Sequence, residues 1–285
     1  MRIFAFFLLI ASTLQALPFP LHFTNDPIDV VIPSTDKDLE TLDLCIAGIR
    51  ENCPKIRRVI VISAKPMTDQ AEWFNEADYP FSIKDVEEQL HFEKTFTKAE
   101  IEKNKERTGW YFQQLLKLYA AFVIPGISSN VLVLDSDTIF LKPVRFLNKR
   151  SAGLYNPGIE YHPQYFDHAA RLLPGLDRVH NQLFGICHHM LFQKCVLKNL
   201  MAEVEALHKV PFWQAFCRCV APEHTAGAGA SEYEIYFSYV FSRTNLVEVR
   251  FLNWVDKADL SLLDRYKENG CHYAACHAYM RSKDE

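Results

Sequence analysis

The sequence lacks a surplus of positive charge. Its 285 residues include 31 Lys and Arg against 35 Asp and Glu, a formal net charge of −4 at pH 7. Proteins that bind nucleic acid usually carry a basic balance or a basic stripe, so this composition argues against a nucleic-acid partner. Internal repeats, low-complexity tracts and long blocks of like charge are also missing. Their absence argues against a repeat architecture or a charged, disordered tail.

The chain also shows no clear interdomain linker. Hydrophobic residues make up 49% of it, which is enough to bury a large core in a chain of this length. We therefore predict one α/β domain over residues 21–285.

The apolar run at the N-terminus is too short for a stable transmembrane helix, which needs about 20 apolar residues. Met1-Arg2 is followed by the apolar stretch 3–10 and then by small residues, with a cleavage point after Ala16. This arrangement is typical of a secretory signal peptide. We expect residues 1–20 to be a signal peptide, with an uncleaved membrane anchor as the alternative. The protein would then be exported to the secretory-pathway lumen, or be associated with the membrane through its N-terminus.

Eight cysteines follow this segment. An even number behind an export signal permits disulfides but does not establish them. Cys45 lies on the apolar side of an expected helix and is predicted to be a core residue. The Cys217-x-Cys219 pair and the segment from Cys271 to Cys276 match no standard zinc-ligand spacing, so zinc is not the expected metal.

Hydrophobic patterning predicts a βαβ unit near the start of the domain. Residues 28–32 and 57–63 are expected strands, and the helix between them has an apolar face and either Asp36 or Asp38 as its cap. Such a unit implies a parallel sheet with a right-handed crossover. Residues 66–106 are expected to form a variable region of short elements. The other predicted elements are helices over 109–122, 194–207 and 232–241, and strands over 131–134, 151–155, 246–251 and 272–278.

The motif Asp135-Ser136-Asp137 directly follows the apolar strand expected over 131–134. Open α/β sheets bind ligands at the carboxyl ends of their strands. Two carboxylates at that position suit a hard divalent cation, Mg²⁺ or Mn²⁺, which can neutralise a departing diphosphate. The alternative is a solvated turn after the strand, and the position behind a buried strand favours the metal site.

The residues around this D-x-D motif carry a family resemblance. Thr138-Ile139-Phe140-Leu141-Lys142-Pro143 continues it, and the segments 107–117, 188–192, 231–234 and 276–279 surround it in a characteristic order. In these segments the chain resembles GT-A glycosyltransferases over roughly residues 28–280, and it looks closest to a largely uncharacterised glycosyltransferase-like family. The resemblance implies an α/β fold of the GT-A (nucleotide-diphospho-sugar transferase) type, with a Rossmann-like mixed central sheet flanked by helices.

The resemblance also implies a metal site. Asp137 would coordinate the cation directly, and Asp135 would contact the ribose, the metal or both. His277 matches the C-terminal histidine that completes the metal shell in several GT-A families, with His272 as the second candidate. A neutral imidazole is compatible with Mn²⁺.

Nucleotide contacts are expected from two places. Pro33, Ser34 and Asp36 match the end of the first GT-A strand, which contacts base and ribose; the alternative is an ordinary strand end with a helix cap. Arg107 and Lys117 are candidate phosphate contacts, because Arg forks onto phosphate and Lys supplies a point charge. A solvated helix face is the alternative for both.

The candidate catalytic residues are His188, His189 and Glu232. One histidine of the pair is expected in the core and the other near the sugar or acceptor. An inverting transferase needs a base for the acceptor hydroxyl, and a carboxylate is the usual choice. Glu232 and Glu234 lie on opposite sides of a helix start; Glu232 is preferred because it follows Ser231 at the loop-to-helix junction. Acids favoured by the helix dipole are the alternative.

The predicted function is therefore transfer of a sugar from a nucleotide-sugar donor, uridine-based rather than guanosine-based, to a hydroxyl of a glycan, lipid or protein. One alternative is a nucleotide- or sugar-binding protein of the same fold without turnover. The other is a haloacid-dehalogenase-type phosphatase with Asp135 as nucleophile. The mid-chain position of the motif, and Ile139 where that class has Thr, argue against the phosphatase.

Overall fold

The computed structural model describes residues 17–91 and 96–281. Residues 1–16, which hold most of the predicted signal peptide or anchor, lie outside the described residues. Within the described ranges, no helix combines the length and apolar character needed to cross a membrane.

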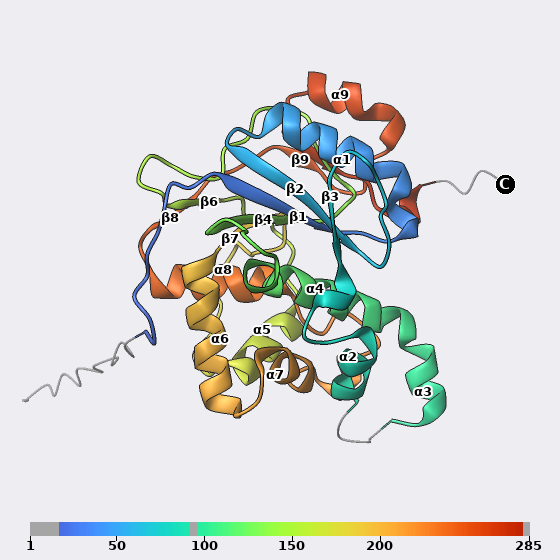
Figure 1. Cartoon of the computed structure of the whole chain (residues 1–285), viewed down its shortest axis with the longest axis vertical. Helices are drawn as coiled ribbons and strands as arrows, with labels where there is room; N and C mark the ends of the chain where they lie inside the picture. Colours follow the sequence, from blue (N-terminus) through green and yellow to red (C-terminus); the bar gives the residue numbers. More distant parts are fainter. Residues whose placement is uncertain (1–16, 92–95, 282–285) are drawn as a thin grey trace, which may run out of the picture.

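A five-stranded mixed sheet forms the centre of the protein (Figure 1), as predicted. Four strands run parallel, and the fifth is antiparallel to its neighbour β4. In spatial order they are β3 (Glu72–Asn75), β2 (Ile56–Ser63), β1 (Ile28–Pro33), β4 (Asn130–Leu134) and β7 (His189–Gln193). Helix α1 (Leu39–Asn52) connects β1 to β2, so the predicted parallel βαβ unit is confirmed.

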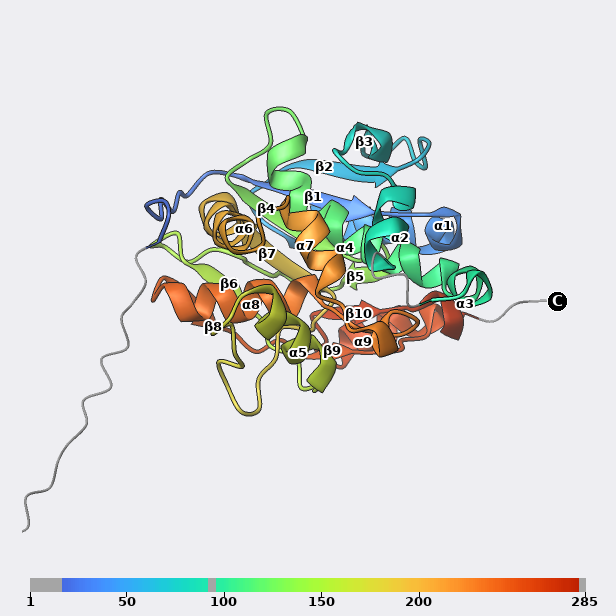
Figure 2. The ribbon, with the colours of Figure 1, turned by 90° about the horizontal axis from the view of Figure 1, so that it is seen from below.

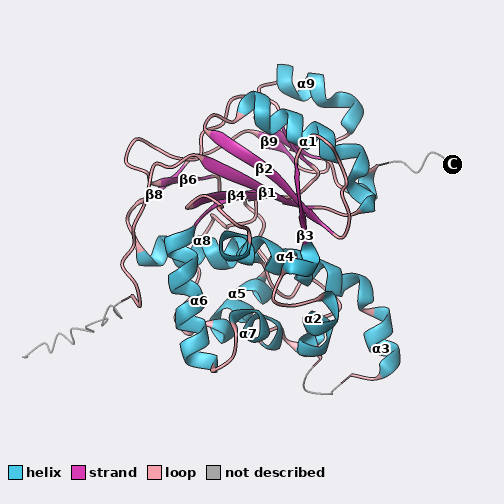
Figure 3. Ribbon diagram, viewed as in Figure 1, coloured by secondary structure: helices cyan, strands magenta, loops and turns pink. Residues whose placement is uncertain are grey.

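Helices cover both faces of this sheet, as Figures 1 and 3 show. Side chains alternate along β1: Val30 and Ile32 pack in the cluster that includes α1, whereas Val31 packs in the cluster that includes α4 (Lys105–Val123). The α4 face also holds α6 (Lys194–His208) and α8 (Glu232–Arg243). Because both faces are covered, consecutive residues 30–32 of β1 and 131–134 of β4 are all apolar, and these runs make the two strands recognisable in the sequence.

A second, three-stranded sheet brings the C-terminal part of the chain to the end of β4. In it, β10 (Tyr273–Ala275) pairs antiparallel with β5 (Thr138–Phe140) and parallel with β9 (Trp254–Val255). A third, two-stranded sheet joins β6 (Gly153–Tyr155) to β8 (Val247–Val249). Seen from below in Figure 2, β10 and β9 lie beside β5. The last strand therefore ends next to the D-x-D motif.

The remaining helices are short. They are α2 (Ile83–Leu90), α3 (Lys98–Lys103), α5 (Pro163–Leu172), α7 (Phe212–Arg218) and α9 (Leu263–Glu268). Residues 66–91 and 96–106 form short elements, as predicted, whereas β7, α5, α7 and α9 were not predicted. The strands expected over 246–251 and 272–278 are only three residues each.

The N-termini of α1 and α8 differ in how they are capped. Asp38 occupies the N-cap position of α1, but its side chain makes no capping hydrogen bond, so the predicted side-chain cap is wrong. Ser231 does cap α8, because its hydroxyl accepts from the backbone N–H of Glu234 at 3.2 Å. All eight cysteines lie in the described residues and carry free thiols.

The absence of a side chain at Gly48 lets α1 approach β5. A Cβ added there would lie 2.7 Å from the carbonyl oxygen of Phe140, a backbone atom that cannot rotate away. We expect Gly48→Ala to lower the free energy of unfolding by about 1–3 kcal/mol through overpacking. The matched control is Gly109→Ala in α4, where the added Cβ meets nothing within 4 Å and helix stability should rise by about 0.5–1 kcal/mol. Chemical denaturation of both variants measures the difference, and equal stabilities would contradict this packing.

Candidate functional site

Acidic and histidine side chains gather at the carboxyl end of β4. Asp135 and Asp137 follow that strand, and the backbone N–H of Asp135 donates to the carbonyl of His188 at 3.0 Å. His188 precedes β7 with φ at +62°, in the left-handed region that most side chains avoid. Such backbone strain is typical of functional sites. Asp135, Asp137, His188 and His277 line one cavity of about 340 Å³.

Asp256 joins the two histidines of this cluster. Its Oδ1 lies 2.8 Å from Nε2 of His277 and 3.4 Å from Nε2 of His188. The other nitrogens face the D-x-D motif: Nδ1 of His277 is 3.2 Å from Asp137 Oδ2, and Nδ1 of His188 is 3.5 Å from Asp135 Oδ2. Asp256 was not predicted. An acid directly after the apolar pair Trp254-Val255 was the available signal, but a two-residue strand is too short to recognise.

The histidine and carboxylate groups of this cluster stabilise one another's charged forms. Burial lowers the pKa of His188, but its hydrogen bonds to Asp135 and Asp256 outweigh burial and raise that pKa to about 9. Hydrogen bonding from His188 lowers the pKa of Asp256. The cluster therefore stabilises positive charge between its carboxylates.

The same residues fit a divalent cation. Ligand atoms of His188, Asp256 and His277 lie within 4.8 Å of one another. Oδ1 of Asp137 is buried and has no hydrogen-bond partner among the described residues. An unsatisfied buried carboxylate oxygen needs an explanation, and a cation is one that the neighbouring nitrogen and oxygen ligands support.

Lys117 forms ion pairs with two carboxylates that line the cavity. Its ammonium group lies 2.5 Å from Asp135 Oδ1 and 2.7 Å from Glu232 Oε1, and its side chain is only 3% exposed. It also donates to the hydroxyl of Tyr233 at 3.1 Å. Burial lowers the pKa of Lys117, yet the charges of Asp135 and Glu232 outweigh burial and raise it. Asp135 is thus shared by Lys117 and His188, which leaves Asp137 as the freer carboxylate of the motif.

Three of the predicted nucleotide contacts lie outside the cavity. Pro33 ends β1 and Ser34 follows it, but neither lines the cavity. Asp36 is exposed and pairs with Lys65 at 2.9 Å. Their neighbours Lys37 and Asp38 line the cavity instead.

Arg107 lines the same cavity, but its position is fixed by two other contacts. Its Nε donates to the carbonyl of Gly227 at 2.7 Å, and its guanidinium lies 4.4 Å from the ring centroid of Trp110.

The two adjacent histidines have different surroundings. His189 is buried among aromatic rings, with centroids 5.2 Å from Phe140 and 4.8 Å from Tyr273. Burial lowers its pKa to about 3, so it is a neutral core residue, whereas His188 faces the cavity. His272, the second metal candidate, accepts a hydrogen bond from the backbone N–H of Asn253 at 3.2 Å and does not line the cavity.

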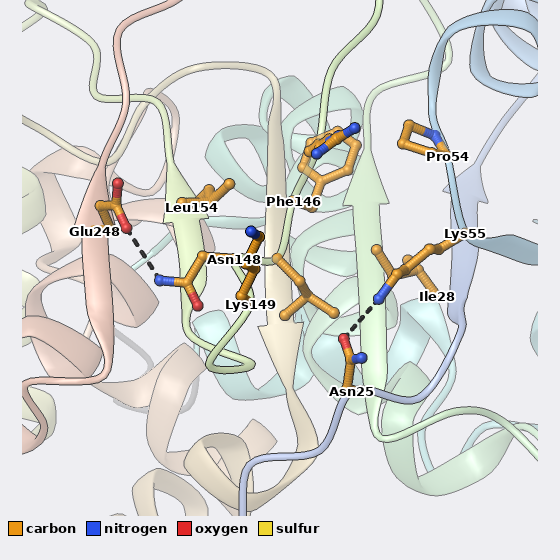
Figure 4. Close-up of a pocket in the computed structure, with 11 residues that line it drawn as sticks. Asn25, Ile28, Pro54, Lys55, Phe146, Asn148, Lys149, Leu154 and Glu248 are labelled. Carbon is orange, nitrogen blue, oxygen red and sulfur yellow. Dashed lines mark hydrogen bonds between the residues drawn. The ribbon is translucent and has the colours of Figure 1, made fainter.

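A larger cavity, of about 620 Å³, lies at the opposite end of the sheet (Figure 4). Ile28, the first residue of β1, and Lys55, just before β2, line it. Its lining includes Glu248, which accepts from Asn148 at 3.0 Å, but no histidine. The acid–histidine chemistry therefore belongs to the smaller cavity at the carboxyl ends of the strands.

Glu234, the alternative base, turns away from the cavity. It is 2% exposed, and it accepts from the backbone N–H of Gly185 at 2.7 Å and from the hydroxyl of Ser238 at 3.1 Å. These bonds secure the loop before β7 to α8.

Glu234 should make stability depend on pH. Burial raises its pKa from 4.5 to about 7, so the folded protein takes up a proton that the unfolded chain has lost. The stability contributed by this proton is complete below pH 4.5 and is lost as the pH rises to about 7, with a slope of at most about 1.4 kcal/mol per pH unit. We expect Glu234→Gln to flatten this part of the profile in denaturation measurements from pH 4.5 to 8. Parallel profiles for the two proteins would show that folding does not raise the pKa of Glu234.

Comparisons with known proteins give a family and distant structural likenesses. No protein with a curated description matches the sequence. The structure is similar to the crystal structure of mouse xyloside xylosyltransferase 1 in its apo form, at 8% identity and a TM-score of 0.42, over 90% of this chain and 99% of that chain. The model of a family of unknown function, DUF6492, matches residues 26–278. The chain therefore belongs to the DUF6492 family.

Proposed function

We propose that the protein is a metal-dependent glycosyltransferase of the GT-A type. The observation that carries this proposal is the cluster of Asp137, Asp256, His188 and His277 at the carboxyl end of β4, open to a cavity of about 340 Å³. Ligands of open α/β sheets bind at this edge, and the cavity volume is within the usual range for small-molecule sites.

The cation would be held by Asp137, His277 and Asp256, with His188 as a further ligand. Mixed imidazole and carboxylate ligands suit Mn²⁺ better than Mg²⁺, which prefers oxygen. The positive charge of Lys117 already balances the carboxylate of Asp135. Asp135 is therefore better suited to orient the donor or His188 than to act as the main metal ligand. When bound, such a cation neutralises the charge of a departing diphosphate.

The donor would be a nucleoside-diphosphate sugar, and we propose a uridine-based one. Lys37 and Arg107 line the cavity and add positive charge near the metal cluster. A diphosphate has the charge to be attracted by these side chains.

Glu232 is the proposed base. It lines the cavity and its Oε1 is held by Lys117, whereas Glu234 is engaged with Gly185. In an inverting transfer, the acceptor hydroxyl gives its proton to Glu232 while its oxygen bonds to the anomeric carbon. The bond from that carbon to the diphosphate breaks, and the nucleoside diphosphate leaves with the electron pair. The acceptor is proposed to be a hydroxyl of a glycan, lipid or protein that the enzyme meets in the secretory pathway or at its membrane.

Thermal unfolding with nucleotides tests the donor site. We expect UDP with Mn²⁺ at about 100 times its Kd to add about 2.7 kcal/mol, which corresponds to a rise of roughly 2–4 °C for a domain approaching this size. UDP alone and Mn²⁺ alone should each give a smaller rise than the two together, and GDP with Mn²⁺ tests the preference for uridine.

Two variants complete the measurement. Asp137→Ala should abolish the rise, whereas Asp264→Ala, an exposed position on α9, should keep it. If a folded wild-type protein responds to no nucleotide with metal, the donor site is refuted. The melting temperature could also rise with UDP and Mn²⁺ while no UDP is released from any UDP-sugar in the presence of glycan, lipid and protein acceptors. That result would favour a binding protein without turnover.

A further inference from the structure

The C-terminal segment crosses the edge of the metal cluster. After β10, the backbone N–H of Cys276 donates to the carbonyl of Asp137 at 2.9 Å. His277 then contacts Asp137 and Asp256, and Ala278 and Tyr279 line the cavity. This segment therefore supplies both a proposed ligand and part of the cavity wall.

Arg281 fastens this segment to the start of α1. Its Nη2 donates to the carbonyl of Lys37 at 3.1 Å and to Asp38 Oδ1 at 3.4 Å, while Nη1 donates to the Thr41 hydroxyl at 3.3 Å. A further ion pair reaches Glu40 at 3.8 Å, and the Arg281 side chain is only 8% exposed. The guanidinium of Arg281 thus donates to a carbonyl, a carboxylate and a hydroxyl, all of them at the start of α1.

Tyr279 and Met280, which lie between His277 and Arg281, are largely exposed and make fewer contacts with the body of the domain than Arg281 does. The ring of Tyr279 stacks on His277 at 5.2 Å, but Tyr279 itself is 72% exposed. Met280 is also exposed, at 52%. Among the described residues after His277, Arg281 is therefore the main link to the body of the domain.

We propose that Arg281 is a positioning residue for the cation. By tying residues 277–281 to α1, it holds the His277 imidazole between Asp137 and Asp256 and keeps the cavity wall closed at Lys37 and Asp38. This inference rests on the proposed function, because it presumes that His277 binds a metal. The planar guanidinium makes these bonds in a fixed fork that a lysine cannot reproduce.

Metal affinity of the full chain tests this role without an activity assay. The free Mn²⁺ signal in electron paramagnetic resonance gives the Kd for each protein. Groups that orient a metal ligand typically change metal affinity by about 10- to 100-fold, and we expect Arg281→Ala to weaken Mn²⁺ binding by at least about tenfold. Arg281→Lys should recover part of the loss, and Arg265→Ala, an exposed arginine on α9, should bind like the wild type.

Thr41→Val provides a second variant from the α1 side. It removes one acceptor of Arg281 and should weaken Mn²⁺ binding by a smaller factor. If Arg281→Ala does not fold, Thr41→Val and Arg281→Lys together test the positioning role. Melting temperatures without metal, measured in parallel, identify a loss of affinity caused by unfolding. Asp137→Ala serves as the metal-free reference.

The outcomes separate the two proposals. If the wild type binds Mn²⁺ and folded Arg281→Ala binds it equally well, Arg281 has no positioning role while the metal site stands. A fall in affinity that follows the melting temperature in all variants, with no recovery in Arg281→Lys, also overturns the positioning role. If the wild type binds Mn²⁺ no better than Asp137→Ala, the proposed metal function fails, and the role of Arg281 fails with it.

Discussion

The buried ammonium group of Lys117 allows two carboxylates to lie at the base of the cavity. Asp135 follows β4 and Glu232 begins α8, and Lys117 reaches both from α4 at 2.5 and 2.7 Å. Without that charge, the buried carboxylate of Glu232 would remain uncompensated, which typically costs several kcal/mol. This ion triad therefore fixes three elements around the cavity and frees Asp137 to face His277. The remainder of the site depends on this arrangement, in which Asp135 pairs with Lys117 and Asp137 faces His277.

Much of this arrangement could be predicted from the sequence, because it follows from short-range patterns. The apolar runs of β1 and β4 identify a sheet covered on both faces, and Asp135 and Asp137 follow the end of β4. The helix expected over 232–241 is α8, which begins at Glu232. His277 was a candidate only through family resemblance, and the structure brings it within 3.2 Å of Asp137.

Other parts of the site depend on contacts between distant segments. Asp256 follows a two-residue strand that exists only because β10 pairs with it, and no local pattern announces such a strand. Which of His188 and His189 faces the cavity follows from the left-handed backbone of His188. Asp36 matched a family position, yet it is turned to solvent, where it pairs with Lys65. Propensity and periodicity contain no information on such long-range geometry.

We propose that imidazole nitrogens and carboxylates at the carboxyl end of β4 bind one divalent cation. Electron spin-echo envelope modulation of bound Mn²⁺ detects directly coordinated histidine nitrogen. We expect nitrogen modulation in the wild-type protein that decreases in His277→Gln, while a His272→Gln control remains unchanged. Stoichiometric Mn²⁺ binding without histidine modulation, or with modulation that survives in His277→Gln and is lost in His272→Gln, would contradict it.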